Sequence, residues 1–187
     1  MPVPDFILDL RAKVGHDMLW LSGATAVILR DGTDGAEVLL VRRSDDGAWS
    51  PVCGIVDPGE DPHVAAIREA AEEAGVLIAV ERLAWLNVTD PVVYANGDVT
   101  QYIDHTFRCR WLSGEPVPVD GEATEARFFP LDALPDMPRN YAERIQVVLA
   151  DRAETVLGRD WPAASTEVPT EVQRPGRAIS QRNPTTV

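Results

Sequence analysis

The order of predicted elements favours an α+β fold, in which a mixed β-sheet is flanked by helices. Two β-prone runs come first, a helix and several further strands follow, and another helix ends the pattern. This order does not repeat as strand–helix–strand units, so a doubly wound parallel sheet is disfavoured. The chain has 187 residues, enough for one domain with a substantial core and short for two.

Residues 4–15 are predicted to form a helix. Pro4 suits its first turn and Gly15 its end. The apolar residues recur at helical spacing, at Phe6, Ile7, Leu10 and Val14. We expect this helix to pack on its own domain, and the alternative is a contact in a homodimer.

The next segments are predicted to be extended. Residues 24–30 and 37–43 are β-prone runs on either side of an Asp/Gly-rich turn, the pattern of a β-hairpin. A loop-rich stretch follows, with a short extended piece at 52–56.

A helix is then predicted to begin at Asp61, which can cap it, with Pro62 in the first helical position and Gly75 as its stop. On a helical projection, four residues face the sheet together: Ala66, Ile67, Ala70 and Ala74.

Beyond this helix, residues 76–89 are predicted to supply one or two strands, 102–112 a long strand and 126–131 a short one, with an Asn-Gly turn before the long strand. Residues 131–135 suggest a brief helical turn. Residues 139–157 suggest an amphipathic helix whose apolar side holds Tyr141, Ile145, Val148 and Leu149. We therefore predict one domain over residues 1–157. Residues 158–187 carry four prolines and no periodicity, and are predicted to be a tail.

The charge balance narrows the function classes. The formal net charge is -13, which disfavours a nucleic-acid polymer and an anionic membrane surface as partners. An acidic protein that handles phosphates needs a cation to offset the repulsion. The two cysteines, Cys53 and Cys109, do not form a disulfide framework, and neither a signal peptide nor an apolar run of membrane-spanning length is present. We expect a cytoplasmic location.

Three glutamates crowd the predicted central helix. Glu69, Glu72 and Glu73 share one face at i, i+3 and i+4, where like charges repel, and Arg68 can pair with Glu72. One interpretation is a solvated acidic face. The other is a site for a hard divalent cation such as Mg²⁺, which prefers carboxylate and carbonyl oxygens and would remove the repulsion.

The spacing around these glutamates resembles a known signature. Gly54 is followed after five residues by Glu60, and after seven more by Arg68-Glu69-Ala70-Ala71-Glu72-Glu73-Ala74-Gly75-Val76. This resembles the Nudix box of Nudix hydrolases, G-x5-E-x7-R-E-U-x-E-E-x-G-U, with Ala70 where a bulkier aliphatic residue is usual. The similarity extends over roughly residues 21–149.

The resemblance implies an α/β/α sandwich and a hydrolase that splits the pyrophosphate bond of a nucleoside diphosphate linked to another moiety, X. It implies Mg²⁺, with Mn²⁺ as a substitute. The implied metal ligands are Gly54 through its carbonyl, Glu60, Glu69, Glu72 and Glu73. One of the glutamates would serve as general base, and Arg68 would hold a carboxylate in place. By the same resemblance, Glu122 on a later loop is a further ligand or base, and is preferred to Glu125.

The substrate is less constrained than the reaction. Pro91, fifteen residues past the box, resembles the ADP-ribose pyrophosphatase pattern, whereas Tyr94, eighteen past it, resembles the dinucleoside polyphosphate pattern. ADP-ribose or a similar nucleotide sugar is the leading expectation. The alternatives are hydrolysis of nucleoside triphosphates, oxidised ones included, and a sensor that binds nucleotide without cleaving it. Candidate substrate contacts are Arg42 or Arg43 for phosphates and Trp49 or Tyr94 for a base.

Overall fold

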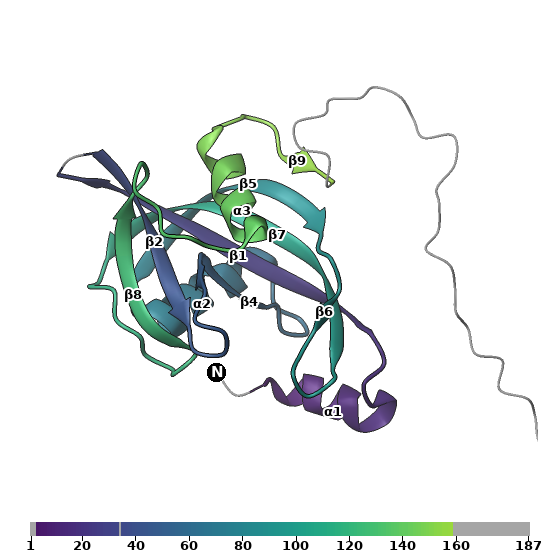
Figure 1. Cartoon of the computed structure of the whole chain (residues 1–187). Coiled ribbons are helices and arrows are strands. Elements are labelled where there is room, and N and C mark those ends of the chain that lie inside the picture. The colour runs from purple at the N-terminus through teal and green to yellow at the C-terminus, as the bar shows by residue number, and fades with distance from the viewer. Residues whose placement is uncertain (1–2, 34, 159–187) are drawn as a thin grey trace, which may run out of the picture.

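The computed structural model describes residues 3–33 and 35–158, and Figure 1 shows their arrangement. The helices are α1 (Asp5–Val14), α2 (Pro62–Ala74) and α3 (Arg139–Leu149). The strands are β1 (Leu19–Gly32), β2 (Gly35–Arg43), β3 (Trp49–Ser50), β4 (Val52–Ile55), β5 (Leu77–Val88), β6 (Val92–Val93), β7 (Val99–Ser113), β8 (Ala123–Pro130) and β9 (Val156–Leu157).

Within this part of the chain the strands form one mixed sheet, in the order β3-β2-β1-β7-β5-β9. Strand β1 runs antiparallel to β2 and parallel to β7. It uses one edge twice, because residues 29–32 pair with β2 and residues 23–26 pair with β4. The short strand β4 is thereby placed beside β1 where β2 has diverged.

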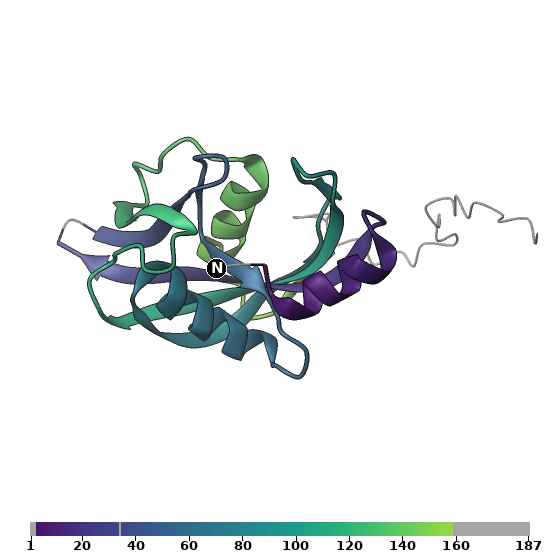
Figure 2. The same ribbon diagram turned by 90° about the horizontal axis from the view of Figure 1, so that it is seen from below.

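Helices α2 and α3 cover opposite faces of the sheet (Figure 2). The alternation of side chains along β1 divides the core between them, since Ala26 and Ile28 pack on the α2 side and Val27 on the α3 side. Both faces are buried, which explains why the strand sequences are almost continuously apolar. The predicted α+β class and the α/β/α sandwich are confirmed.

Helix α2 lies close to the sheet because small residues line its inner face. Ala65, Ala66, Ala70 and Ala74 are all buried. Ile67, which the helical projection placed on this face, is instead 37% exposed. Asp61 is the N-cap residue as predicted, but its side chain makes no capping hydrogen bond. Gly75 ends the helix in the left-handed conformation, with φ 67°.

Two predictions near the C-terminus are wrong in detail. Residues 131–135 hold no helix: 131 and 132 form a turn, in which the N–H of Ala133 donates to the carbonyl of Pro130 at 3.0 Å, and 134–135 have no regular structure. The last helix ends at Leu149, and β9 then pairs with β5 at residues that were predicted to be helical. The predicted tail, apart from Gly158, lies outside the described residues.

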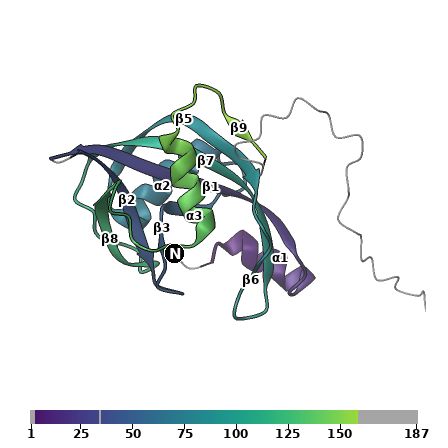
Figure 3. The same ribbon diagram turned by 45° about the horizontal axis from the view of Figure 1, so that its top comes forward.

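Helix α1 packs beside the β6–β7 hairpin at one end of the sheet (Figure 3). Ile7 is buried with Leu19 and Leu21 of β1. The guanidinium of Arg11 donates to the carbonyl of Val99 at 2.8 Å and lies 3.4 Å from the Asp98 carboxylate, so it joins α1 to the hairpin. No helix in residues 3–33 and 35–158 has both the length and the apolar character that a bilayer crossing requires.

Candidate active site

The glutamates of α2 do not form a solvated face. Glu69 and Glu73 are only 3% and 4% exposed, whereas the side chain of Glu72 is 39% exposed. A buried carboxylate is costly unless it is paired or binds a cation. The burial of both Glu69 and Glu73, one helical turn apart, therefore indicates a site where carboxylates are paired or bind a cation.

Arg68 connects the carboxylates of the helix to the preceding loop. Its guanidinium donates to both oxygens of Glu60 at 3.0 Å, to Glu69 at 2.8 Å and to Glu72 at 2.9 Å. It also donates to the carbonyl of Ile55 at 3.1 Å. The pairing expected between Arg68 and Glu72 is thus confirmed, and the same side chain also fixes Glu60 and Glu69.

Gly54 is required by space rather than by backbone conformation. A Cβ built at this position would lie 2.0 Å from Oε1 of Glu69 and 2.1 Å from its carboxyl carbon. The Glu69 carboxylate therefore rests directly on the backbone of β4. A glycine at this register is what allows a buried acid to reach the strand edge.

The pKa values of Glu69 and Glu73 are raised because both acids are buried and lie close to other carboxylates. Burial raises the pKa of Glu69 to about 7, against the stabilising charge of Arg68, and Glu72 and Glu122 raise it further. Burial, with repulsion from Glu69 and Glu122, raises the pKa of Glu73 well above its ordinary value. A cation placed among these groups would favour their charged forms and lower both pKa values.

Glu122 comes from the loop before β8 and reaches the same place. Its backbone N–H donates to Oδ1 of Asp120 at 2.9 Å, and its carbonyl accepts from the N–H of Ser44 at 2.8 Å, so the loop is held against β2. Glu125, the other acid on this segment, pairs instead with Arg42 at 2.8 Å on the surface. Of the two acids, Glu122 is the one that the fold brings to the buried glutamates.

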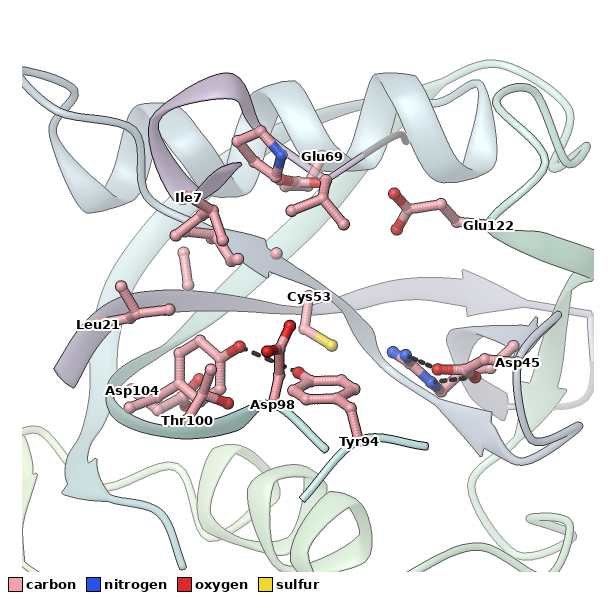
Figure 4. Close-up of a pocket in the computed structure, with 18 of the residues that line it drawn as sticks. Ile7, Leu21, Asp45, Cys53, Glu69, Tyr94, Asp98, Thr100, Asp104 and Glu122 are labelled. Carbon is pink, nitrogen blue, oxygen red and sulfur yellow. Dashed lines mark hydrogen bonds and ion pairs between the residues drawn. The ribbon is translucent and has the colours of Figure 1, made fainter. Parts of the chain in front are cut away.

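Of these acids, Glu69 and Glu122 line a cavity of about 620 Å³ (Figure 4). Glu69 and Glu122 lie towards α2, and Tyr94 lies on the opposite side of Cys53. The lining away from the acids includes Arg11, which contacts the β6–β7 hairpin, and the two tyrosines Tyr94 and Tyr102, whose hydroxyls are 3.1 Å apart; Ile7 of α1 also lines the cavity. The cavity thus has an acidic end and a partly apolar, aromatic end.

The structure separates the predicted substrate contacts. Tyr94 and Arg43 line the cavity. Arg42 points to the surface, where it pairs with Glu125, and Trp49 packs edge-on against Phe129 at a centroid distance of 4.8 Å in the α3-side core. Neither Arg42 nor Trp49 is among the cavity-lining residues.

Several cavity residues were not found by sequence reasoning. Arg144 of α3 and Asp104 of β7 both line the cavity and are nearly inaccessible to solvent. Their local sequences read as an ordinary amphipathic helix and an alternating strand. The available signal was that Arg144 adjoins Ile145 on the apolar side of its helix, where a charge is out of place. Ile7 was assigned to packing and Arg11 was given no role, because nothing in their sequence indicates a cavity.

The oxygen-rich donor set fits a hard divalent cation, because Gly54 leaves room for a carboxylate and the buried acids repel one another. Within residues 3–33 and 35–158, however, no three His, Cys, Asp or Glu side chains converge as a ready-made metal cluster. Arg68 occupies oxygens of Glu60, Glu69 and Glu72, so ligation by these residues requires some of its contacts to rearrange.

Cys53 adjoins Gly54 and also lines the cavity. Burial and the nearby Glu73 raise the pKa of its thiol to about 12, so the reactive thiolate is disfavoured.

Comparison with known proteins identifies the domain. A model of the NUDIX domain matches residues 20–152. The NAD-capped RNA hydrolase NudC of Pseudomonas aeruginosa is 37% identical over 134 residues, covering 67% of this chain and 45% of NudC. The putative mutator protein MutT4 of Mycobacterium tuberculosis is 33% identical over 144 residues, covering 75% and 56% of the two chains. The chain therefore spans about half the length of these relatives.

A solved structure shares the fold. The ADP-ribose pyrophosphatase of Streptococcus suis superposes with a TM-score of 0.54 at 24% identity, covering 75% of this chain and 98% of that one. The matched family region begins after α1, so the helix that lines one wall of the cavity lies outside it.

Proposed function

Because the chain belongs to the NUDIX family, we propose that it hydrolyses, with a divalent cation, the pyrophosphate bond of a nucleoside diphosphate linked to X. The observation that carries this proposal is a buried carboxylate, Glu69, at one end of a cavity of about 620 Å³, with a second buried carboxylate, Glu73, on the same helix. Burial and neighbouring acids raise the pKa of both groups, which suits a site that receives a cation. A cation there makes an acidic cavity able to accept phosphates.

The proposed cation is Mg²⁺, with Mn²⁺ able to replace it. Glu69, Glu72 and Glu73, with the carbonyl of Gly54, would hold it. Glu60 is a weaker candidate because both its oxygens contact Arg68. When bound, the cation would neutralise charge on the phosphate oxygens and lower the pKa of an attacking water.

The protein's own residues would orient the substrate and accept the proton. Arg68 holds Glu69 in place, and Glu69, which lines the cavity, is one candidate proton acceptor. Glu122 reaches the same cavity from the facing loop and is the alternative proton acceptor. At the far end, Tyr94 and Tyr102 offer aromatic faces for a base.

The leading substrate is ADP-ribose or a similar nucleotide sugar. The name of the NudC relative indicates an NAD cap as substrate, and NAD, like ADP-ribose, joins an adenosine to a second group through a pyrophosphate. The net charge of -13 supports the free nucleotide over a capped RNA, because an RNA chain would be repelled. Hydrolysis of a nucleoside triphosphate, oxidised ones included, is the second candidate.

A substrate panel tests the proposal. The full chain is incubated with Mg²⁺ and ADP-ribose, NAD, a nucleotide sugar, nucleoside triphosphates with their oxidised forms, and NAD-capped RNA. Release of nucleoside monophosphate from ADP-ribose with the highest kcat/KM is the expected result. Preference for a triphosphate would select the second candidate. Tight binding of a panel member without any product would contradict hydrolysis and favour a nucleotide sensor.

A further inference from the structure

A buried cation interrupts the apolar packing of α3. Arg144 is only 6% exposed and lies between the helix and the sheet, beside the fully buried Ile145 and Val148. The strands below it carry a polar row, because Thr25 pairs in register with Cys53 on one side and with Thr106 on the other. A charge is costly in such a position unless its donors find partners.

Asp104 is the main partner of Arg144, and its own oxygens are shared. One Asp104 oxygen accepts from Thr25 Oγ1 at 2.8 Å and the other from Thr106 Oγ1 at 2.7 Å. Arg144 Nη2 lies farther away, at 3.4 Å. The guanidinium also neighbours the thiol of Cys53 and the ring of Tyr141, whose centroid is 5.4 Å away.

This leaves donors of Arg144 facing open space. A guanidinium has five N–H donors in a planar fork. Arg144 lines the 620 Å³ cavity and also a second cavity of about 540 Å³ on its other side. Buried, charged and only partly paired, it presents donors to whatever enters the first cavity.

The other cations of the cavity are engaged elsewhere. Arg11 donates to the carbonyls of Gly15 at 3.0 Å and Val99 at 2.8 Å. Arg43 makes a forked pair with Asp45, at 2.9 and 2.5 Å. Arg144 is therefore the cavity cation with the fewest hydrogen bonds to the chain.

The position of Arg144 relative to the glutamates suits a diphosphate. Successive residues of a strand point to opposite faces of the sheet. Gly54 faces α2 and contacts Glu69, and the preceding Cys53 faces α3 and neighbours Arg144. The cavity includes residues from both faces around the short strand β4, so groups at its two ends can be held from the two faces.

We propose that Arg144 binds a phosphate of the substrate through its guanidinium fork, on the opposite face of β4 from the carboxylates. The inference rests on the proposed function, because it names the group that holds one phosphate of the nucleoside diphosphate. It assigns the α3 face of the sheet to phosphate binding and the α2 face to the cation.

The test is equilibrium binding of α,β-methylene-ADP, which resists hydrolysis, to the full chain in Mg²⁺ by calorimetry. Arg144→Met removes the charge and should weaken binding about tenfold or more. Arg144→Lys keeps the charge without the fork and should fall between that variant and the wild type. Arg110→Met is the matched control, because Arg110 pairs with Glu81 at 3.2 Å and lines neither cavity.

Asp104→Asn separates a binding role from a structural one. If Arg144 only stabilises the core, losing either partner should lower Tm and weaken binding alike. If Arg144 binds phosphate, Asp104→Asn should bind the analogue as tightly as the wild type or more tightly, since a competing anion is removed. If Arg144→Met does not fold, Arg144→Lys decides.

Two results would overturn the inference. The first is binding at the wild-type Kd by Arg144→Met, or by Arg144→Lys if Arg144→Met does not fold. The second is no binding of the analogue by the wild type at millimolar concentration. The measurement does not require turnover. Arg144-dependent binding in a protein that hydrolyses no member of the substrate panel would refute the proposed function and leave this inference standing.

Discussion

The acidic end of the cavity comes mainly from one continuous stretch, residues 54–73, whereas the opposite end is assembled from α1, the β6–β7 turn and α3. At the first end, Arg68 links acids that are near in sequence. At the second, Arg11 bridges segments that are 88 residues apart. The residues proposed for the chemistry thus lie close together in the sequence, whereas those proposed to contact the rest of the substrate come from distant segments. Substitutions at the first end should therefore lower kcat, and those at the second should raise KM.

The largest effect is expected from Glu73→Gln. This change keeps the shape of a buried side chain but removes its charge, so kcat should fall about hundredfold or more. Folding should be retained, because burial already disfavours the charged form of Glu73. Steady-state kinetics and a thermal melt check both points. Glu115→Gln, on an exposed loop, is the control. Wild-type turnover in Glu73→Gln would remove Glu73 from the site.

Gly54→Ala tests whether the strand and the helix fit together as tightly as the structure shows. The added Cβ would overlap Glu69, so the carboxylate must move. We expect a loss of about 1–3 kcal/mol in the free energy of unfolding, together with a large drop in kcat. Denaturant melts measure the first quantity. Gly23→Ala, whose Cβ would meet its nearest atom at 3.5 Å, is the stability control and should cost less. Equal losses in the two variants would refute the tight contact.

Arg11→Met probes the other end of the cavity. Loss of the contacts to Val99 and Asp98 should loosen the wall formed by α1 and the hairpin. We expect KM to rise several-fold while kcat stays near the wild-type value, because the glutamates are untouched. Lys13→Met, exposed on the same helix, should change neither constant. A fall in kcat with unchanged KM would contradict the division between the two ends.

The smallest effect concerns the stability of the metal-free protein. The pKa of Glu69 is raised to about 7, so the folded state binds this proton more tightly than the unfolded state does. Its contribution to stability is complete below the ordinary value of 4.5 and is lost as the pH rises through about 7. In EDTA, Tm should therefore fall by a few degrees between pH 5 and pH 8.

Mg²⁺ should reduce this dependence on pH, and Glu69→Gln should reduce it without Mg²⁺, leaving the part that comes from the raised pKa of Glu73. Glu60 does not interfere, because the hydrogen bonds from Arg68 hold its pKa below its ordinary value and outside this pH range. A Tm that rises with pH in EDTA would show that the Glu69 carboxylate is not destabilised by burial.

The features that the sequence predicted correctly are those formed by residues close together in the chain, and the features it missed depend on distant segments. The β1–β2 hairpin, α2 and its glutamates were predictable because their signals are local: alternation, capping positions and fixed spacing. The burial of Glu69 was not, because it depends on the space above Gly54 in a strand that pairs with β1. Arg144 was missed for a similar reason, since its partner Asp104 lies on a strand in the middle of the sheet.

Helix α1 also bears on how this enzyme family can diversify. It supplies Ile7 and Arg11 to the cavity wall, yet it precedes the matched domain, residues 20–152. A segment of this kind can change by mutation, recombination or replacement without disturbing the glutamates that we propose for the chemistry. A polypeptide trimmed to residues 20–152 would keep the glutamates proposed for the chemistry and would lose the cavity wall formed by α1. We therefore expect such a trimmed domain to accept a wider range of substrates than the 187-residue chain does.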